Sequence, residues 1–200
     1  MALTTMAIHD LTVAVLGCVC VALDRTAEQL TGQPGCPSCR ACVVPGQPAW
    51  DSCDDPCGEE ASSGGQLTVS AARIYPSSEA DFPAESRIVQ GVRGCTPPSI
   101  TALELVVTLL RCAPTFSEDG CPPSCMELAE TAQVLHVDMA TVYSALQCCL
   151  PGTEQRRRGR RFVMGQQKVI GPEGGCVGLE QRATVALPAC GRCQDAEESP

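Results

Sequence analysis

Alternating apolar positions mark the stretch around which the chain is organised. Over residues 100–111, one face of an extended chain carries a large apolar side chain at every second position: Leu103, Leu105, Val107 and Leu109. The other face is mixed, with Ala102, Glu104, Val106, Thr108 and Leu110. Because successive side chains of a strand point to opposite faces, this pattern predicts a central strand with one strongly apolar face.

A long amphipathic helix is predicted after this strand, beyond a turn region rich in proline and glycine. Ser124 is of the type that caps helix N-termini, and Glu127 stands three residues later, as in a capping box. Apolar residues then recur at steps of three and four: Leu128, Ala132, Leu135, Met139, Val142, Leu146 and Cys149. The spacing predicts a helix over residues 124–150 whose stripe packs on the apolar face of the strand.

Shorter patterns predict the remaining elements. Residues 7–30 fit a first helix, whose buried side would carry Leu11, Val15, Cys18 or Val19, Ala22 and Leu30. Extended segments are predicted at residues 40–44, 66–75, 162–165, 167–170 and 179–187. Since strands and helices do not alternate, the order favours an α+β fold: an antiparallel or mixed sheet of four to six strands packed against two α-helices, with long loops. We expect one domain over residues 1–188 and an acidic, cysteine-containing tail over residues 189–200.

Charge and composition narrow the classes of partner. The net charge is -9, and only three Phe, two Tyr and one Trp are present. A chain of this kind has neither the basic surface nor the aromatic platforms of a nucleic-acid-binding protein, so any contact with DNA would be local. Residues 11–23 are apolar, but His9 and Asp10 precede them where a signal peptide has a basic region. We therefore expect a soluble helix here, no membrane partner, and synthesis in a cytoplasm.

Sixteen cysteines are the compositional oddity. Cys36 and Cys39, with Cys42 at the same spacing, and Cys190 and Cys193 form Cys-x-x-Cys steps. Three interpretations stay open for them: plain thiols, disulfides formed after release from a reducing cytoplasm, or a zinc site joining both clusters. For the cysteines inside patterned elements, we expect reduced side chains that act as small hydrophobes: Cys18, Cys20, Cys112, Cys148 and Cys149.

Catalytic constellations are not visible in the sequence. The two imidazoles, His9 and His136, lie far apart, and we expect His136 to be a partly buried structural residue. The turn at residues 171–175 is not followed by a helix N-terminus, so it does not form a phosphate cradle. We expect no enzymatic activity and no cofactor.

One basic cluster interrupts the acidic chain. Its members are Arg156, Arg157, Arg158, Arg160 and Arg161. These side chains are either solvated or make contacts, with acidic groups of a neighbouring subunit or with DNA in a channel.

Several stretches resemble the cysteine-rich neck and tail proteins of long-tailed actinobacterial phages. They are RIYPS at 73–77 with Phe82-Pro83 downstream, VVTLLRCAP at 106–114, PSC at 123–125 and GPEGGCVG at 171–178. Together with the order of helix, three strands, helix and closing strands, the chain over residues 1–188 resembles a tail terminator.

The resemblance implies a structural virion protein that forms a ring, usually of six copies. Such a ring ends the tail tube and receives the head connector, so the implied partners are further copies, the tail tube protein, connector or stopper proteins, and the genome passing through. A head-to-tail connector or stopper of the same neck region is the alternative, and a cysteine-rich zinc-binding module is the second alternative.

Overall fold

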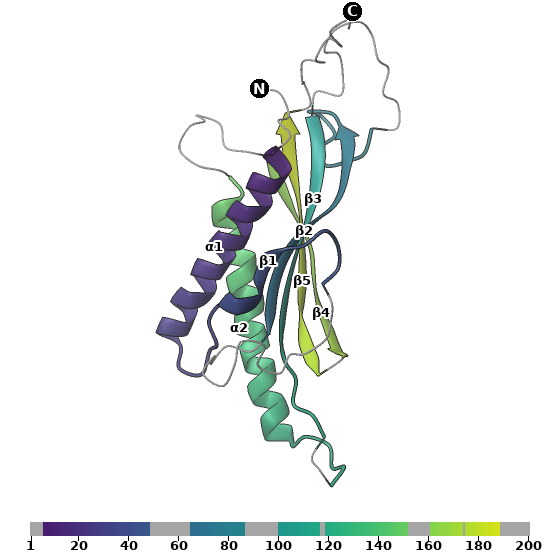
Figure 1. Cartoon of the computed structure of the whole chain (residues 1–200). Helices are drawn as coiled ribbons and strands as arrows, with labels where there is room; N and C mark the ends of the chain where they lie inside the picture. Colours follow the sequence, from purple (N-terminus) through teal and green to yellow (C-terminus); the bar gives the residue numbers. More distant parts are fainter. Residues whose placement is uncertain are drawn as a thin grey trace, which may run out of the picture.

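The structure is a computed structural model, and it describes residues 6–48, 65–86, 100–116, 119–151, 161–173 and 175–188. These described residues form two α-helices, one short 3-10 helix and five strands, whose arrangement is drawn in Figure 1. In chain order these are α1 (Ala7–Gln29), η1 (Ser38–Arg40), β1 (Ala41–Val43), β2 (Gln66–Ser77), β3 (Ile100–Cys112), α2 (Cys125–Cys149), β4 (Phe162–Glu173) and β5 (Cys176–Pro188).

A single mixed sheet holds all five strands, in the order β1-β2-β3-β5-β4. Only the short edge strand β1 runs parallel to its neighbour; the other pairs are antiparallel. Strand β3 lies in the middle and pairs along its whole length with β5, from Ile100 opposite Pro188 to Cys112 opposite Cys176. The segments predicted at 162–165 and 167–170 form one strand, β4, whose register with β5 shifts between Met164 and Gln167.

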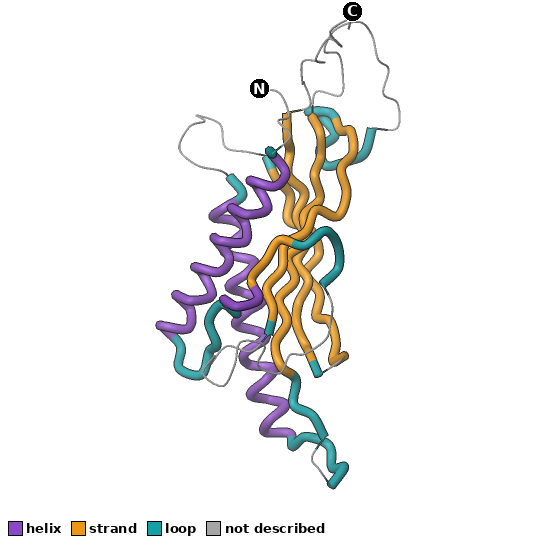
Figure 2. The backbone as a smooth tube through the Cα atoms, in the orientation of Figure 1, coloured by secondary structure: helices purple, strands orange, loops and turns teal. Residues whose placement is uncertain are grey.

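Both helices pack on the same face of this sheet, giving two layers (Figure 2). The predicted apolar face of β3 supplies the centre of the core, since Leu103, Leu105, Val107 and Leu109 are all buried in the cluster shared with α1 and α2. The other face of β3 carries no helix, yet Ala102, Val106 and Leu110 on it are also buried. The predicted α+β class with a mixed sheet against two helices is thus confirmed.

The capping box of α2 is present as predicted, because Ser124 and Glu127 exchange side-chain to backbone hydrogen bonds. Two predictions about buried stripes are wrong at the helix ends. In α2, Leu128 is exposed because the first turns extend past the end of the sheet (Figure 1). In α1, the buried stripe ends with Leu23, and Leu30 lies at the exposed end of the helix.

Helix α1 is, by length and composition, the one described helix that could cross a membrane, a property shared by core helices and signal sequences. In this fold it packs on the sheet with Leu11, Val15, Val19 and Leu23 buried. The predicted tail at residues 189–200 lies outside the described residues.

Candidate functional site

An open groove runs between α1 and α2 on the side that faces away from the sheet. It has a volume of about 1240 Å³ and is lined by small and apolar side chains, among them Val21, Ala132, Val137 and Ala140. Arg25 and His136 are the titratable side chains of the lining other than cysteine. We call this feature the helix groove. Small-molecule pockets usually enclose about 300–1,000 Å³, so its size and openness suit a segment of protein better.

Two links fix the walls of the helix groove. The disulfide Cys18–Cys149 joins α1 to α2 with a Cα–Cα distance of 6.4 Å. Further along, the hydroxyls of Thr26 and Thr141 are 3.2 Å apart. Since residue 18 pairs with 149 and residue 26 with 141, the helices run antiparallel. These covalent and polar contacts within one copy therefore fix the position of α1 relative to α2, and with it the shape of the groove.

The lower end of α2 and the loop before it form a second surface, which we call the tip (residues 113–116 and 119–128). It projects beyond the sheet and beyond α1 (Figure 1). Phe116 and Met126 are each 70% exposed there, and Leu128 is 49% exposed. The ionised side chains of the tip are Asp119 and Glu127, and hydrogen bonds from Ser124 hold the pKa of Glu127 below its usual value. An apolar and acidic surface thus lies at one end of the molecule.

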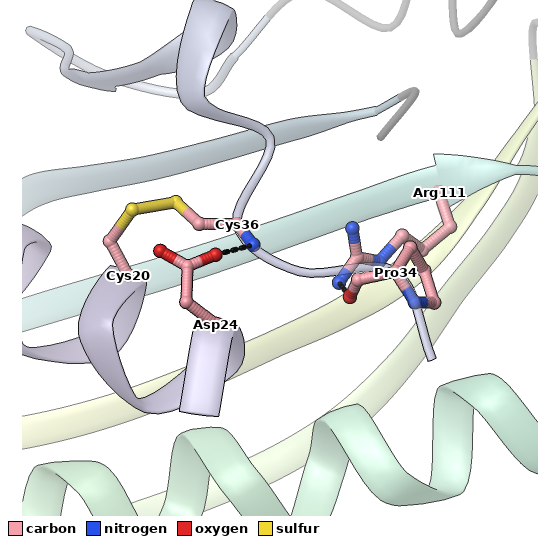
Figure 3. Close-up of a disulfide and its surroundings, with 5 residues drawn as sticks. All are labelled: Cys20, Asp24, Pro34, Cys36 and Arg111. Atoms are coloured by element: carbon pink, nitrogen blue, oxygen red, sulfur yellow. Dashed lines mark hydrogen bonds between the residues drawn. A yellow bond between two sulfur atoms is a disulfide. The ribbon is translucent and has the colours of Figure 1, made fainter. Parts of the chain in front are cut away.

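A second disulfide, Cys20–Cys36, joins α1 to the segment that enters β1, with a Cα–Cα distance of 4.9 Å (Figure 3). Beside it, the backbone N–H of Cys36 donates to the Asp24 carboxylate at 2.8 Å. The expectation of reduced cysteines in the patterned elements is therefore wrong for Cys18, Cys20 and Cys149. Tertiary packing decides this pairing, because it brings together thiols that are up to 131 residues apart in sequence.

The predicted Cys-x-x-Cys residues are only partly placed. Cys36 pairs with Cys20 and not with a member of its own cluster, and Cys39 is also disulfide-bonded. Cys190 and Cys193 lie outside the described residues. A disulfide sulfur is not the thiolate that zinc requires, and the described part of the chain contains no group of three or more residues able to hold a metal.

Three of the described cysteines carry exposed free thiols in different places. Cys42 lies on β1, Cys125 begins α2 in the tip, and Cys148 lines the helix groove. They make independent chemical probes of three surfaces.

A buried ion pair locks the two layers together. Arg111 at the end of β3 donates from Nε to Asp138 Oδ2 at 2.8 Å and from Nη2 to Asp138 Oδ1 at 3.1 Å. Gln33 donates to the same carboxylate at 2.7 Å, and Arg111 also reaches the carbonyl of Pro34 (Figure 3). Burial raises the pKa of Asp138, although the hydrogen bonds from Arg111 and Gln33 oppose the shift. The remaining nitrogen, Arg111 Nη1, is buried with no hydrogen-bond partner among the described residues.

A network of alternating charges covers the helix-free face of the sheet. Glu104 accepts from Arg73 at 2.6 Å and from Arg182 at 2.9 Å. Arg182 in turn donates to Glu180 at 2.9 Å, and Lys168 lies 3.4 Å from the same carboxylate. Burial raises the pKa of Glu104, but the hydrogen bonds from Arg73 and Arg182 outweigh it, so the pKa lies below its usual value. The positive charges are matched by carboxylates, which leaves this face without a free phosphate-binding cluster among the described residues.

Of the predicted arginine cluster, only Arg161 is described. Its Nη1 donates to the backbone carbonyl of Glu79 at 2.6 Å, and its guanidinium lies 5.4 Å from the centroid of the Phe82 ring. Arg156, Arg157, Arg158 and Arg160 lie outside the described residues. The proposal of a subunit or DNA contact therefore stays a prediction.

His136 is exposed and lines the helix groove, so the expectation of a partly buried histidine is wrong. Leu135 faces the core, and the next residue, His136, lies about 100° further round the helix, so its side chain points to solvent.

Sequence reasoning missed the ion pair and the groove, although signals for both exist. Arg111 continues the period-two face of Leu103 to Leu109, and Asp138 stands on the stripe between Leu135 and Val142. When two apolar faces pack together and each carries one charged residue, the two charges are expected to pair, because an unpaired buried charge is costly. The groove is signalled by alanines at the edge of the predicted stripe, where Ala132 belongs to the stripe and Ala129 and Ala140 stand beside it.

No protein-family model and no curated protein matches this sequence.

Proposed function

We propose that the chain is a structural subunit of the neck of a long-tailed phage, a tail terminator whose copies close into a ring. The ring ends the tail tube and joins it to the head connector. The observation that carries the proposal is the helix groove, an open and mostly apolar groove that the described residues leave uncovered. A groove of this shape and lining offers a place for a segment of another copy to bind.

The stretches that resemble phage neck and tail proteins suggest the same assignment, and two of them lie at the end of β3 and at the turn between β4 and β5. A ring subunit needs a rigid body and surfaces for its neighbours. The Arg111–Asp138 pair and the disulfides Cys18–Cys149 and Cys20–Cys36 supply rigidity.

Disulfides also suit the life of a virion. They persist in oxidising surroundings and are rare in a reducing cytoplasm. A protein that assembles in the host and then acts in a released particle would acquire them after lysis. We therefore propose that the disulfides stabilise the finished neck. Assembly itself would depend on non-covalent contacts.

A phage lacking this gene tests the proposal. A terminator ends the tube, so its loss leaves tails of irregular length that are not joined to heads, and the protein supplied in trans restores tails of uniform length. Tails of normal length that stay unjoined would assign the protein to the connector or stopper instead. Normal virions without the gene would contradict a place in the neck.

A further inference from the structure

We infer that the ring contact is heterologous: the tip of one copy seats in the helix groove of the next copy. This inference rests on the proposed function and specifies which surfaces meet. The two surfaces lie at different places on one chain, so each copy offers both halves of the contact, and a repeat of the contact generates a ring if the rotation closes.

The helix groove has the chemistry to receive the tip. Its lining consists mostly of small and apolar side chains, and Arg25, which is exposed, is the one arginine or lysine in it. No aspartate or glutamate lines it. The Thr26–Thr141 contact ties the walls in either redox state, and in the oxidised protein Cys18–Cys149 ties them as well. The groove is therefore preorganised, and little order has to be gained on binding.

The tip has the complementary chemistry. Phe116 and Met126 are large, apolar and 70% exposed, the kind of side chain that acts as an anchor in a pocket. Asp119 and Glu127 supply negative charge that matches Arg25. A molecule with a net charge of -9 repels its own copies in general, so a contact needs a local match of this type.

The order of elements makes the contact directional. The lining of the helix groove begins at Ala129, immediately after the tip ends at Leu128, and continues to Cys148 near the other end of α2. Tip and groove therefore follow one another along a single helix, which places successive copies head to tail.

Complementation between two variants tests this contact. Phe116→Ser with Met126→Ser removes the anchors and leaves the groove intact, whereas Ala140→Glu places a carboxylate in the groove and leaves the tip intact. All three positions are outside the core, so the fold is retained. Each variant alone should associate at least about tenfold more weakly than the unmodified protein. An equimolar mixture should form a dimer, with one tip in one groove, and nothing larger.

Matched controls make the same kinds of change, apolar to serine and neutral to glutamate, outside the tip and the groove. Val169→Ser alters an exposed apolar residue of β4, and Gln147→Glu adds a charge to α2 outside the groove lining. Both should assemble as the unmodified protein does. Sedimentation velocity measures all of these species.

Thiol alkylation of the unmodified protein gives a second readout. In the assembly, Cys148 in the groove and Cys125 in the tip should both react more slowly with a maleimide than in the dilute monomer, while Cys42 on β1 keeps its rate. If rings form but Cys125 and Cys148 stay fully reactive and both variants assemble, the tip-to-groove contact is wrong and the ring proposal survives. If the unmodified protein stays monomeric at high concentration, both are wrong.

Discussion

Asp138 and Arg111 illustrate what a buried charge pair does in this molecule. Each partner has less than a tenth of its side chain exposed, and together they connect β3, α2 and the segment that follows α1. Taking two charges out of water is costly, so the pair contributes orientation of the layers more than net stability.

Breaking the pair from one side should be severely destabilising. We expect Asp138→Leu to lower the free energy of unfolding by about 3–5 kcal/mol, because Arg111 is left buried and unpaired. Replacing both partners, with Arg111→Met and Asp138→Leu, should recover most of that loss. Urea unfolding of the two variants measures the difference; equal stability of the single and the double variant would show that the charges are not coupled.

Glu104 gives the molecule a defined acid sensitivity. Its pKa is lower in the folded protein than in the unfolded chain, so its contribution to stability is complete above 4.5, the ordinary value, and is lost as the pH falls below it. Glu104→Gln should therefore lower stability at pH 7 and make the decline below pH 4.5 shallower. Glu28→Gln, an exposed change in α1, serves as the control. If stability falls with pH in the same way in Glu104→Gln and in the unmodified protein, the charge network is not the cause of the acid sensitivity.

The two halves of α2 have different roles. Its C-terminal half packs on the sheet, and its N-terminal turns form the tip. Leu135 is 7% exposed and Leu128 is 49% exposed, although both stand on the same predicted stripe.

We expect Leu135→Ala to cost about 2–5 kcal/mol through loss of buried surface and creation of a cavity. Leu128→Ala should change stability by less than about 0.5 kcal/mol, as surface substitutions do. Chemical denaturation of both variants measures this. A loss below about 1 kcal/mol for Leu135→Ala would contradict the packing of α2 on β3.

The disulfides Cys18–Cys149 and Cys20–Cys36 should differ in their effect on stability. Cys18–Cys149 closes a loop with a sequence separation of 131, and Cys20–Cys36 one of 16. On the chain-entropy estimate, removing the first with paired serines costs about 5 kcal/mol and removing the second about 3 kcal/mol. Thermal unfolding of the two paired-serine variants, compared with the unmodified oxidised protein, measures each loss separately. If removing Cys20–Cys36 costs more stability than removing Cys18–Cys149, then contacts in the folded state, and not the entropy of the unfolded chain, determine the effect of each bond.

Local periodicity was sufficient to predict the elements themselves. The period-two face of β3, the stripe of α2 from Leu135 on and the capping box depend on neighbours within a few residues, and these are present as expected. The pairing of Cys18 with Cys149 depends on the antiparallel packing of two helices, which no local pattern reports. The exposure of Leu128 depends on where the sheet ends relative to α2, and that too is a tertiary property.

At the scale of the whole molecule, the two faces of one copy differ: the charges on one face are paired with one another, and the other face carries the apolar groove. The helix-free face of the sheet is covered by a charge network whose members neutralise one another. The helix side carries the uncovered groove, with the tip beyond it. If copies associate as proposed, their contacts therefore lie on the helix layer, and the charged face of the sheet takes no part in them.

The central claim is that copies of this chain close into a ring. Negative-stain images of the purified, oxidised protein at high concentration test it most directly. We expect closed rings of one diameter, with copies related by rotation about a central opening. Isolated single copies, or twofold dimers that grow no further, would contradict it.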